Sequence, residues 1–401
     1  MNSPRRWPLH PRPGPVESLS SWLERTARTY NLSVKDLLTH NLGQLDVTAP
    51  EVVDWDPPAA ILAALAERTG ADLAQLRMMT LAGWVPWLMD TLHTRQWDAQ
   101  ETFDTYIRQN SVLFTPGEAG RNQVTVTGRE RWRGPWRPAR RLDRRCQVCA
   151  AGADPRRALM WQLPLTVGCV DHGCRLEDAR EIAQAAVRDE KPQPVPVDEP
   201  LATLDRYTYE GLITGRVTLP GRTVHVGVWF RLLRSLLDEV SLALSTRSAR
   251  ARTTLERIWL AAGRPERGGL NVWRPYEQMD WPMQEAMLHA AAAALQLAAD
   301  GRITARGTLG SALAPAPRRH VYDGDQPSPH VNAWQEAIAQ AEAAIALART
   351  DRDTARQLLA LLTIGCRTRD RFEEECAYLF GIGIPAGFLP SARELGRADL
   401  A

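Results

Sequence analysis

The chain has 401 residues, of which 44% are hydrophobic and 24% carry a charged side chain. This composition is typical of a globular protein and excludes a chain disordered throughout, and the length allows two to four domains. The formal net charge of +2 does not by itself indicate binding to nucleic acid. The N-terminus lacks the apolar run of a signal peptide, and the longest apolar segment, residues 286–299, is too short to span a membrane. We therefore expect a soluble, cytoplasmic protein without membrane contact.

Residues 17–95 carry the pattern of two related helical hairpins. Ser21 and Glu24 have the spacing of a capping box at the start of the first helix. In the second hairpin, Pro58 stands at the start of a helix and Gly70 at its end. Such hairpins either lay a recognition helix in a DNA groove or simply pack as a helical domain. The sequence predicts a helix-turn-helix-like N-terminal domain.

Arginines concentrate between residues 121 and 145, where nine of them stand against two acidic residues, a local charge of +7. Trp132 and Trp136 are interleaved with them. Guanidinium groups bind phosphates bidentately, so this stretch is the strongest candidate for nucleic-acid contact. The alternative is that the arginines bind acidic groups of this protein or of a partner. The candidate DNA-contacting residues are Arg129, Arg131, Arg133, Arg137, Arg140, Arg141, Arg144 and Arg145.

Four of the six cysteines fall between residues 146 and 174. Cys146 and Cys149 form one short-spaced pair, and after nineteen residues Cys169 and His172 form another. Two such pairs can each wrap one tight turn around a tetrahedral zinc ion, and in a reducing compartment they indicate metal ligands rather than disulfides. We predict one structural Zn²⁺ on these four residues, with Cys174 as an alternative to His172 and a redox dithiol as the competing interpretation.

The intervening residues 160–167 are predicted to form a short strand or knuckle under the metal. The rest of the chain reads as further helices, one hairpin and two proline-rich linkers. The linkers are predicted at 189–200 and 312–329, the hairpin at 217–224, and the helices at 228–244, 253–262, 282–299, 331–349, 351–364 and 369–380. The last two helices are a second helix-turn-helix candidate.

We therefore predict a mainly α, multidomain fold. Its expected parts are a helix-turn-helix-like domain at 1–95, a zinc-binding knuckle domain at 96–185, a helical domain with a small hairpin at 201–312 and a C-terminal helical domain at 330–401. The sequence contains no phosphate-binding loop, nucleophile elbow or zincin motif. These absences favour a binding or adaptor protein over an enzyme.

Several stretches of the chain together resemble one family. They are residues 13–18 with Ser21-Trp22-Leu23, the Arg144-Arg145-Cys146-x-x-Cys149 segment, and residues 161–165 leading to Cys169-x-x-His172-Gly173, with 214–217 and 229–233 as weaker similarities. Over residues 8 to about 180 the chain is similar to the TniQ/TnsD family of transposition proteins. The resemblance implies a non-catalytic target-selection factor, and it carries the zinc ligands over to Cys146, Cys149, Cys169 and His172.

The resemblance also implies partners. Family members bind a target DNA site, or a Cascade-type CRISPR effector complex, and recruit a transposon AAA+ ATPase of the TniB/TnsC type. Many relatives have a second Cys-x-x-Cys where this chain has residues 177–179, so one zinc ion is expected rather than two. The competing function is a stand-alone, zinc-containing DNA-binding transcriptional regulator. The sequence leaves open whether the chain forms a homodimer.

Overall fold

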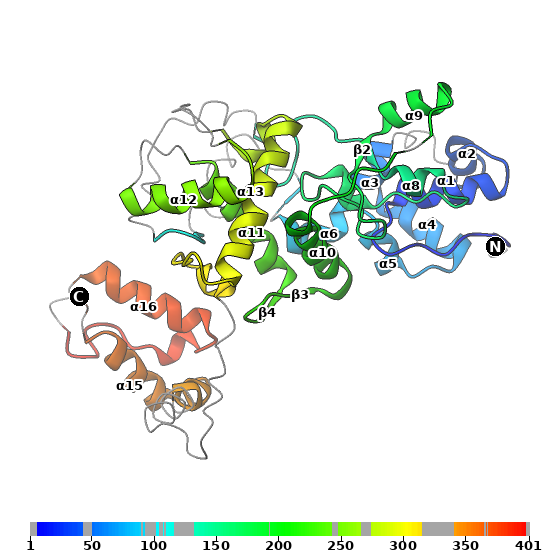
Figure 1. The fold of residues 1–401 in the computed structure, drawn as a ribbon. Helices are drawn as coiled ribbons and strands as arrows, with labels where there is room; N and C mark the ends of the chain where they lie inside the picture. The colour runs from blue at the N-terminus through cyan, green and yellow to red at the C-terminus, as the bar shows by residue number, and fades with distance from the viewer. Residues whose placement is uncertain are drawn as a thin grey trace, which may run out of the picture. The chain divides into compact units, whose positions relative to one another are not determined.

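The computed structural model describes residues 6–42, 50–89, 91–92, 102–103, 107, 110–115, 132–191, 193–242, 248–265, 274–314, 341–364, 366 and 368–397. Over these residues the chain is mainly α-helical, as the sequence predicts, with two small two-stranded sheets (Figure 1). It divides into two compact units, Met1–Arg318 and Arg319–Ala401. Among the helices in the described ranges, none has the length and apolar character needed to cross a membrane.

The first unit begins with a group of short helices. These are α1 (Leu19–Thr29), α2 (Val34–Leu42), α3 (Pro50–Trp55), α4 (Ala59–Thr69), α5 (Leu73–Met78) and α6 (Leu81–Leu88). They share a core that includes Trp22, Leu37 and Leu65. The prediction for α4 is confirmed, because Pro58 is its N-cap and Gly70 ends it in the left-handed conformation at φ 74°.

The predicted capping box at Ser21 and Glu24 is wrong. The N-cap of α1 is Ser18, whose hydroxyl accepts a hydrogen bond from the Ser21 backbone N–H at 3.2 Å. Ser21 therefore lies inside the helix, and its own hydroxyl donates to the carboxylate of Glu17 at 2.9 Å. Serines at 18, 20 and 21 all have the right chemistry for an N-cap, so spacing alone did not identify the right one.

The cysteine-rich segment follows, with very little regular structure. It contains β1 (Arg144–Arg145), α8 (Gln147–Ala151), the 3₁₀ helix η3 (Leu159–Gln162), β2 (Glu177–Asp178) and α9 (Ala179–Val187), and β1 pairs with β2 in antiparallel register. The sequence predicts a short strand or a knuckle at 160–167, and the structure has η3 at 159–162 followed by turns at 163–165, so the strand alternative is wrong. Leu159, Met160 and Trp161 are all buried, and a strand would turn alternate side chains to opposite faces.

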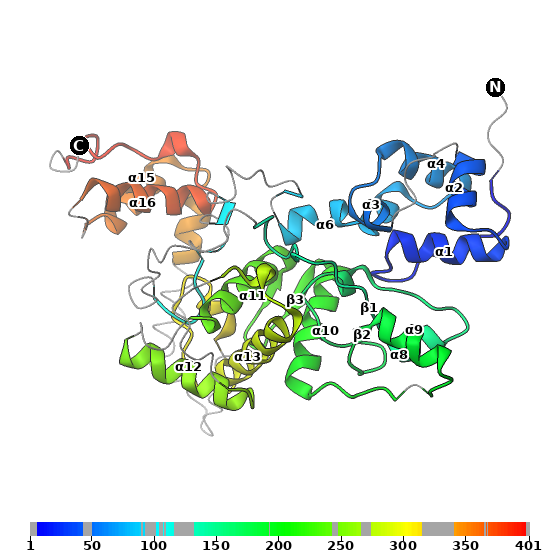
Figure 2. The same ribbon diagram turned by 90° about the horizontal axis from the view of Figure 1, so that it is seen from above.

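The remainder of the first unit is built on long helices. Its elements are α10 (Glu199–Thr214), the hairpin of β3 (Arg216–Thr218) and β4 (Thr223–His225), α11 (Val226–Val240), α12 (Ala249–Ala261), η5 (Tyr276–Gln278), α13 (Trp281–Ala299) and η6 (Gly310–Leu313). The predicted hairpin is confirmed, with Val217 opposite Val224. Figure 2 shows α11 beside α13, and the two helices are in contact.

One hydrophobic core runs through both the cysteine-rich segment and these helices. It includes Cys146 and Leu165 from the former and Trp229, Phe230 and Ala291 from the latter. Residues placed by the sequence in two separate domains, 96–185 and 201–312, therefore contribute to one core. The four-domain division stays a prediction.

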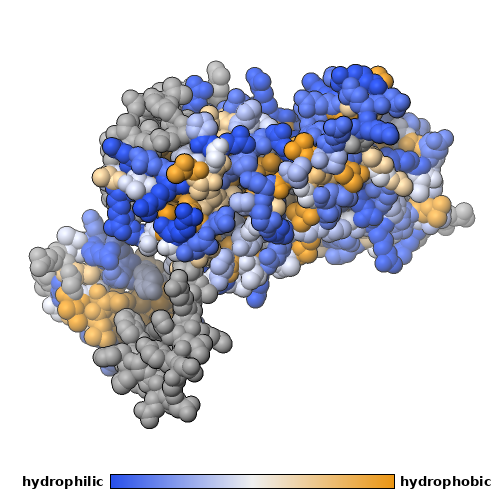
Figure 3. Space-filling model, viewed as in Figure 1, coloured by the Kyte–Doolittle hydropathy of each residue, from blue (hydrophilic) through white to orange (hydrophobic). Residues whose placement is uncertain are grey.

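The second unit contains α15 (Arg352–Leu362), α16 (Arg369–Gly381) and the 3₁₀ helix η7 (Ala386–Phe388). Ala355, Leu359, Phe372 and Leu379 are among the residues of its small core. Of the helix predicted at 331–349, residues 341–348 are helical, while 331–340 and most of the predicted linker at 312–329 lie outside the described residues. Exposed apolar side chains gather on this unit (Figure 3).

Candidate metal centre

Cys146 and Cys149 are held by the start of a short helix. The chain leaves β1 at Arg145, and Cys146 becomes the N-cap of α8, where its Sγ accepts the Cys149 N–H at 3.4 Å. The register of β1 against β2 pairs Arg145 with Glu177. Residues 177–179 thus form β2 and the start of α9, which close the segment.

Cys169 and His172 lie on a tight turn. The Gly173 N–H donates to the Cys169 carbonyl at 2.8 Å, and the Cys169 N–H donates to the Cys174 carbonyl, also at 2.8 Å. Gly173 has a φ of 62°, a conformation that side-chain-bearing residues rarely adopt. The turn brings the Cys169 thiol and the His172 ring to the same side as the first pair.

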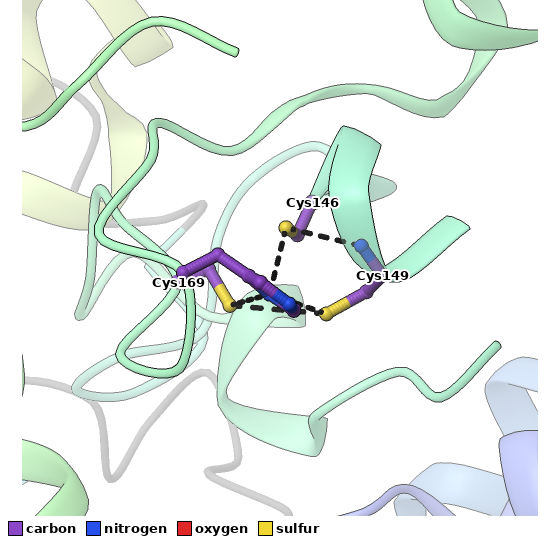
Figure 4. Close-up of side chains that lie close together, drawn as sticks. Cys146, Cys149 and Cys169 are labelled. Carbon is purple, nitrogen blue, oxygen red and sulfur yellow. Dashed lines mark hydrogen bonds between the residues drawn. The ribbon is translucent and has the colours of Figure 1, made fainter. Parts of the chain in front are cut away.

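The four predicted ligands converge. Their donor atoms all lie within 4.8 Å of one another. The Nδ1 atom of His172 is 3.6 Å from Cys146 Sγ, 3.3 Å from Cys149 Sγ and 3.5 Å from Cys169 Sγ (Figure 4). The sulfurs of Cys149 and Cys169 are 3.8 Å apart.

These separations match what a tetrahedral ion requires. Zinc bonds of about 2.3 Å to sulfur and about 2.0 Å to nitrogen place neighbouring ligand atoms about 3.5 Å (S to N) and about 3.8 Å (S to S) apart. The observed separations lie close to both values. The cluster can therefore hold one metal ion, and three thiolates with one imidazole are a donor set that suits zinc.

Cys174 lies next to the cluster without belonging to the group of four. Its Sγ is 3.4 Å from Cys146 Sγ, and the residue is buried. The four residues whose donor atoms all lie close enough together to share one ion include His172 and not Cys174. Cys174 is thus placed to donate a thiol hydrogen bond to Cys146.

The thiols perturb one another strongly. Hydrogen bonds from Cys149 and Cys169 lower the pKa of Cys146 far below its usual range. The hydrogen bond with Cys146 in turn raises the pKa of Cys149. A bound cation would stabilise the thiolate form of all three ligand cysteines.

Arg144 anchors the loop between the two ligand pairs. It is buried, and its guanidinium donates to the carbonyls of Trp161 at 3.1 Å, Leu163 at 2.7 Å and Thr166 at 2.7 Å. It also stacks 4.0 Å from the centre of the Trp281 ring. Burial lowers the pKa of Arg144 to about 10. The sequence offered this residue as a DNA contact, but its donors are directed into the protein.

Asp205 fixes the other end of the same loop. From α10 its carboxylate accepts the Val167 N–H at 3.1 Å and the Gly168 N–H at 2.7 Å, directly before Cys169. Burial raises the pKa of Asp205 to about 7. Sequence reasoning missed this residue, because an aspartate inside a helix more than thirty residues away carries no local signal of the contact.

The predicted linker at 189–200 also packs against the ligand turn. The Arg175 N–H donates to the Val195 carbonyl at 2.8 Å, and the Val197 N–H donates to the Gly173 carbonyl at 3.0 Å. The segment is therefore extended and hydrogen-bonded, and it connects the turn directly to α10.

Two ion pairs tie the ligand loop to α1. Arg157 contacts Glu24 at 2.6 Å, and Arg25 contacts Asp154 at 2.6 Å. A backbone hydrogen bond of 2.9 Å from the Ser18 N–H to the Arg157 carbonyl joins the same two segments. The ligand loop of the metal site is therefore joined to α1 by two ion pairs and to its N-cap by a backbone hydrogen bond.

The eight candidate DNA-contacting arginines occupy different environments. Arg129 and Arg131 lie outside the described residues. Arg137 is half-buried, donates to the Leu92 carbonyl at 3.0 Å and stacks 4.6 Å from the Trp55 ring centre. Those with accessible side chains are Arg133, Arg140 and Arg141, which are exposed, and Arg145, which is half-exposed.

Comparison with known proteins gives one match. Residues 8–176, somewhat less than half of the chain, match the TniQ family model. No curated protein and no solved structure matches the chain. The matched range contains both ligand pairs and ends just beyond them, so the family resemblance and the metal geometry coincide in the same segment. By this match, residues 8–176 resemble a TniQ domain, the domain of a transposition-associated family.

Proposed function

We propose that this protein is a non-catalytic target-selection adaptor of DNA transposition, shaped by one structural Zn²⁺. The observation that carries the proposal is the TniQ match, whose range ends on a four-residue ligand cluster with tetrahedral spacing. Cys146, Cys149, Cys169 and His172 would hold the ion. Four protein donors leave no open coordination position, which is the arrangement of a structural rather than a catalytic zinc site.

The ion would supply a cross-link between two segments that have little other structure. Arg144 and Asp205 hold the ends of the loop between the ligand pairs, and the zinc would hold its ligand-bearing turns together. Because the loop is also paired to α1, the site would set how the N-terminal helices are presented.

Target DNA would be held by the accessible part of the arginine cluster. Arg133, Arg140 and Arg141 are exposed, and Arg145, five residues after Arg140, is half-exposed. Arg137 and Arg144 would contribute to the fold instead, because carbonyl oxygens and indole rings occupy their guanidinium groups. Phosphate contacts of this kind predict affinity that falls steeply with salt.

The second partner would be the AAA+ ATPase of the transposon that encodes this chain. An adaptor has to hold target and ATPase together, so the two surfaces should be separable by mutation. In a guide-directed system, a Cascade-type complex would replace the direct target contact.

The test is a recruitment assay with purified, zinc-loaded protein, that ATPase and labelled duplex DNA. The wild-type chain should form a complex containing both partners. The double variant Arg133→Glu/Arg140→Glu should lose DNA while retaining the ATPase. A charge-reversal control at a single site is Arg222→Glu, in the turn of the β3–β4 hairpin, which should retain both partners. Tight DNA binding with no ATPase contact would instead identify a stand-alone regulator.

A further inference from the structure

A groove of about 1000 Å³ opens beside the arginine cluster. One wall is the segment 138–142, and the others come from the end of α12, from η5 and from the start of α13. It is larger than three other pockets in the described part of the chain, which have volumes of about 580, 440 and 90 Å³, and none of the metal-site residues lines it.

The groove is strongly basic. Arg140, Arg141, Arg264 and Arg274 line it, and Asp280 is the one acidic residue among its described lining. Arg264 is engaged with His289 at 3.0 Å. Arg140 and Arg274 are exposed, and within the described residues neither makes a hydrogen bond or an ion pair. Because they come from different walls, two uncompensated guanidinium groups flank the groove.

The surface of the groove between these charges is apolar and contains an aromatic ring that is held in place by a neighbouring guanidinium group. Met279 and Met283 line it together with Trp281, which is partly exposed. The Arg144 guanidinium lies 4.0 Å from the Trp281 ring centre and is itself fixed by three carbonyls. The indole is thus held in place from behind, which lowers the entropy cost of stacking another flat group on it.

We propose that this groove binds single-stranded nucleic acid. Phosphates of the strand would lie against Arg140 and Arg274, and an unstacked base would pack on Trp281 and the two methionines. This combination of guanidinium groups along the backbone path and an aromatic platform for bases is how single strands are recognised without sequence preference. A duplex keeps its bases stacked inside and would leave the apolar floor unused.

An acidic peptide is the other polyanion that fits the charge. Peptides laid in grooves gain much of their affinity from main-chain hydrogen bonds to an open backbone edge. Here the Ala139 N–H of the 138–142 wall already donates to the Glu277 carbonyl at 2.9 Å. The groove also carries the guanidinium groups of Arg140 and Arg274 on different walls, which favours a ligand whose charge repeats along its backbone.

The inference rests on the proposed DNA contact and makes it more specific. The duplex would meet Arg133 and Arg145, which do not line the groove, together with Arg140 and Arg141, which do. The groove itself would take a strand separated from the duplex. Arg274 lies outside the arginine cluster picked out by the sequence. A variant at Arg274 therefore tests binding in the groove without changing the proposed duplex contacts.

The experiment compares fluorescein-labelled oligo-dT, a duplex of equal length and polyglutamate by fluorescence anisotropy over a salt series. Oligo-dT should bind the zinc-loaded full chain at least tenfold more tightly than the duplex binds. The variant Arg274→Glu should weaken oligo-dT binding about tenfold and flatten the salt dependence by about 0.7 in slope, the value for one lost phosphate contact on a single strand. The control Arg222→Glu should change neither.

A second pair of variants tests the aromatic platform. Trp281→Ala should weaken oligo-dT binding at least fivefold, in line with the loss of one stacked base, whereas Trp281→Phe should stay within threefold of wild type. Equal or tighter binding of the duplex would overturn the groove proposal while leaving the proposed target contact intact. Arg274-dependent binding of polyglutamate without oligo-dT binding would assign the groove to a protein partner. A chain that binds oligo-dT but never recruits the ATPase would contradict the proposed function alone.

Discussion

Arg144 and Arg145 are neighbours in the sequence with opposite roles in the structure. Both belong to the same basic run, yet Arg144 is buried under the ligand loop and Arg145 is half-exposed. The strand pairing of β1 with β2 explains the difference, since successive side chains of a strand point to opposite faces. An arginine run therefore says little about which of its members reach a partner.

This contrast gives a stability prediction. Arg144→Gln would leave three buried carbonyls without their donor, and each such group costs about 1–3 kcal/mol. We expect the free energy of unfolding to fall by at least about 3 kcal/mol. The neighbouring Arg145→Gln should change it by less than about 0.5 kcal/mol. Urea denaturation followed by tryptophan fluorescence measures both, and equal effects of the two variants would refute the anchoring role of Arg144.

The ligand cysteines give a second prediction at this scale. Cys146→Ser should reduce the bound zinc from one ion per chain to none and expose residues 144–178 to hydrogen exchange, because the ion would supply much of the folding energy there. Cys376→Ser, in the second unit, should keep the zinc and the exchange pattern. Elemental analysis with exchange mass spectrometry reads out both. A Cys146→Ser chain that stays zinc-loaded and protected would count against the ligand assignment.

Among the helices and strands, the sequence-based predictions are correct where adjacent residues alone determine the structure. Pro58 and Gly70 bound α4, and the Val217–Val224 pairing forms the predicted hairpin, because caps and turns depend on a few adjacent residues. The sequence left a strand and a knuckle open at 160–167, because burial of the three consecutive side chains of η3 depends on the core that surrounds them. The predicted linker before α10 is hydrogen-bonded to the ligand turn, a contact that its own sequence does not signal.

The contact between α13 and the start of α10 predicts a pH effect. His289 Nδ1 lies 3.5 Å from Asp198, and burial lowers the pKa of His289 below 6.5 in the folded state. The unfolded chain therefore binds the proton more readily, so stability is full above pH 6.5 and is lost as the pH falls through the folded pKa. Arg264 and Arg175 strengthen this direction, while Asp198 opposes it.

His289→Gln should remove this dependence. Between pH 7 and pH 5 the wild type should lose more stability than the variant, by at most about 1.4 kcal/mol per pH unit, the limit for one proton. Thermal unfolding at both pH values measures the difference, and the acid effect on the metal site is common to both chains. Identical slopes would show that His289 takes up its proton equally in the two states.

At the scale of the whole molecule, the metal site belongs to a connected unit. Its loop is joined to α1 by Arg157 and Arg25, to α10 by Asp205 and to α13 by stacking of Arg144 on Trp281. The second unit has its own core around Leu359 and Phe372. Loss of the metal should therefore spread within one unit and stop at its boundary.

Metal removal tests this connectivity. Treating the protein with a strong zinc chelator should raise hydrogen exchange in residues 144–178 and also in α1, about 130 residues away in sequence but linked by the two ion pairs. Helices α15 and α16 should keep their protection because their core is separate. Faster exchange in α15 and α16, or unchanged exchange in α1, would contradict the proposed path of coupling.

The sequence by itself determined the mainly helical class, the resemblance of residues 8–176 to the TniQ family and the two short-spaced pairs of the ligand cluster. Those signals are local or are spaced by short loops, so a few adjacent residues carry each of them. Only the tertiary structure decided that Arg144 faces inward, that Asp205 supports the ligand loop and that Arg274 and Trp281 share a groove with Arg140. Each of these facts joins segments far apart in the chain, where contact depends on the packing of the whole core rather than on any pattern near the residue.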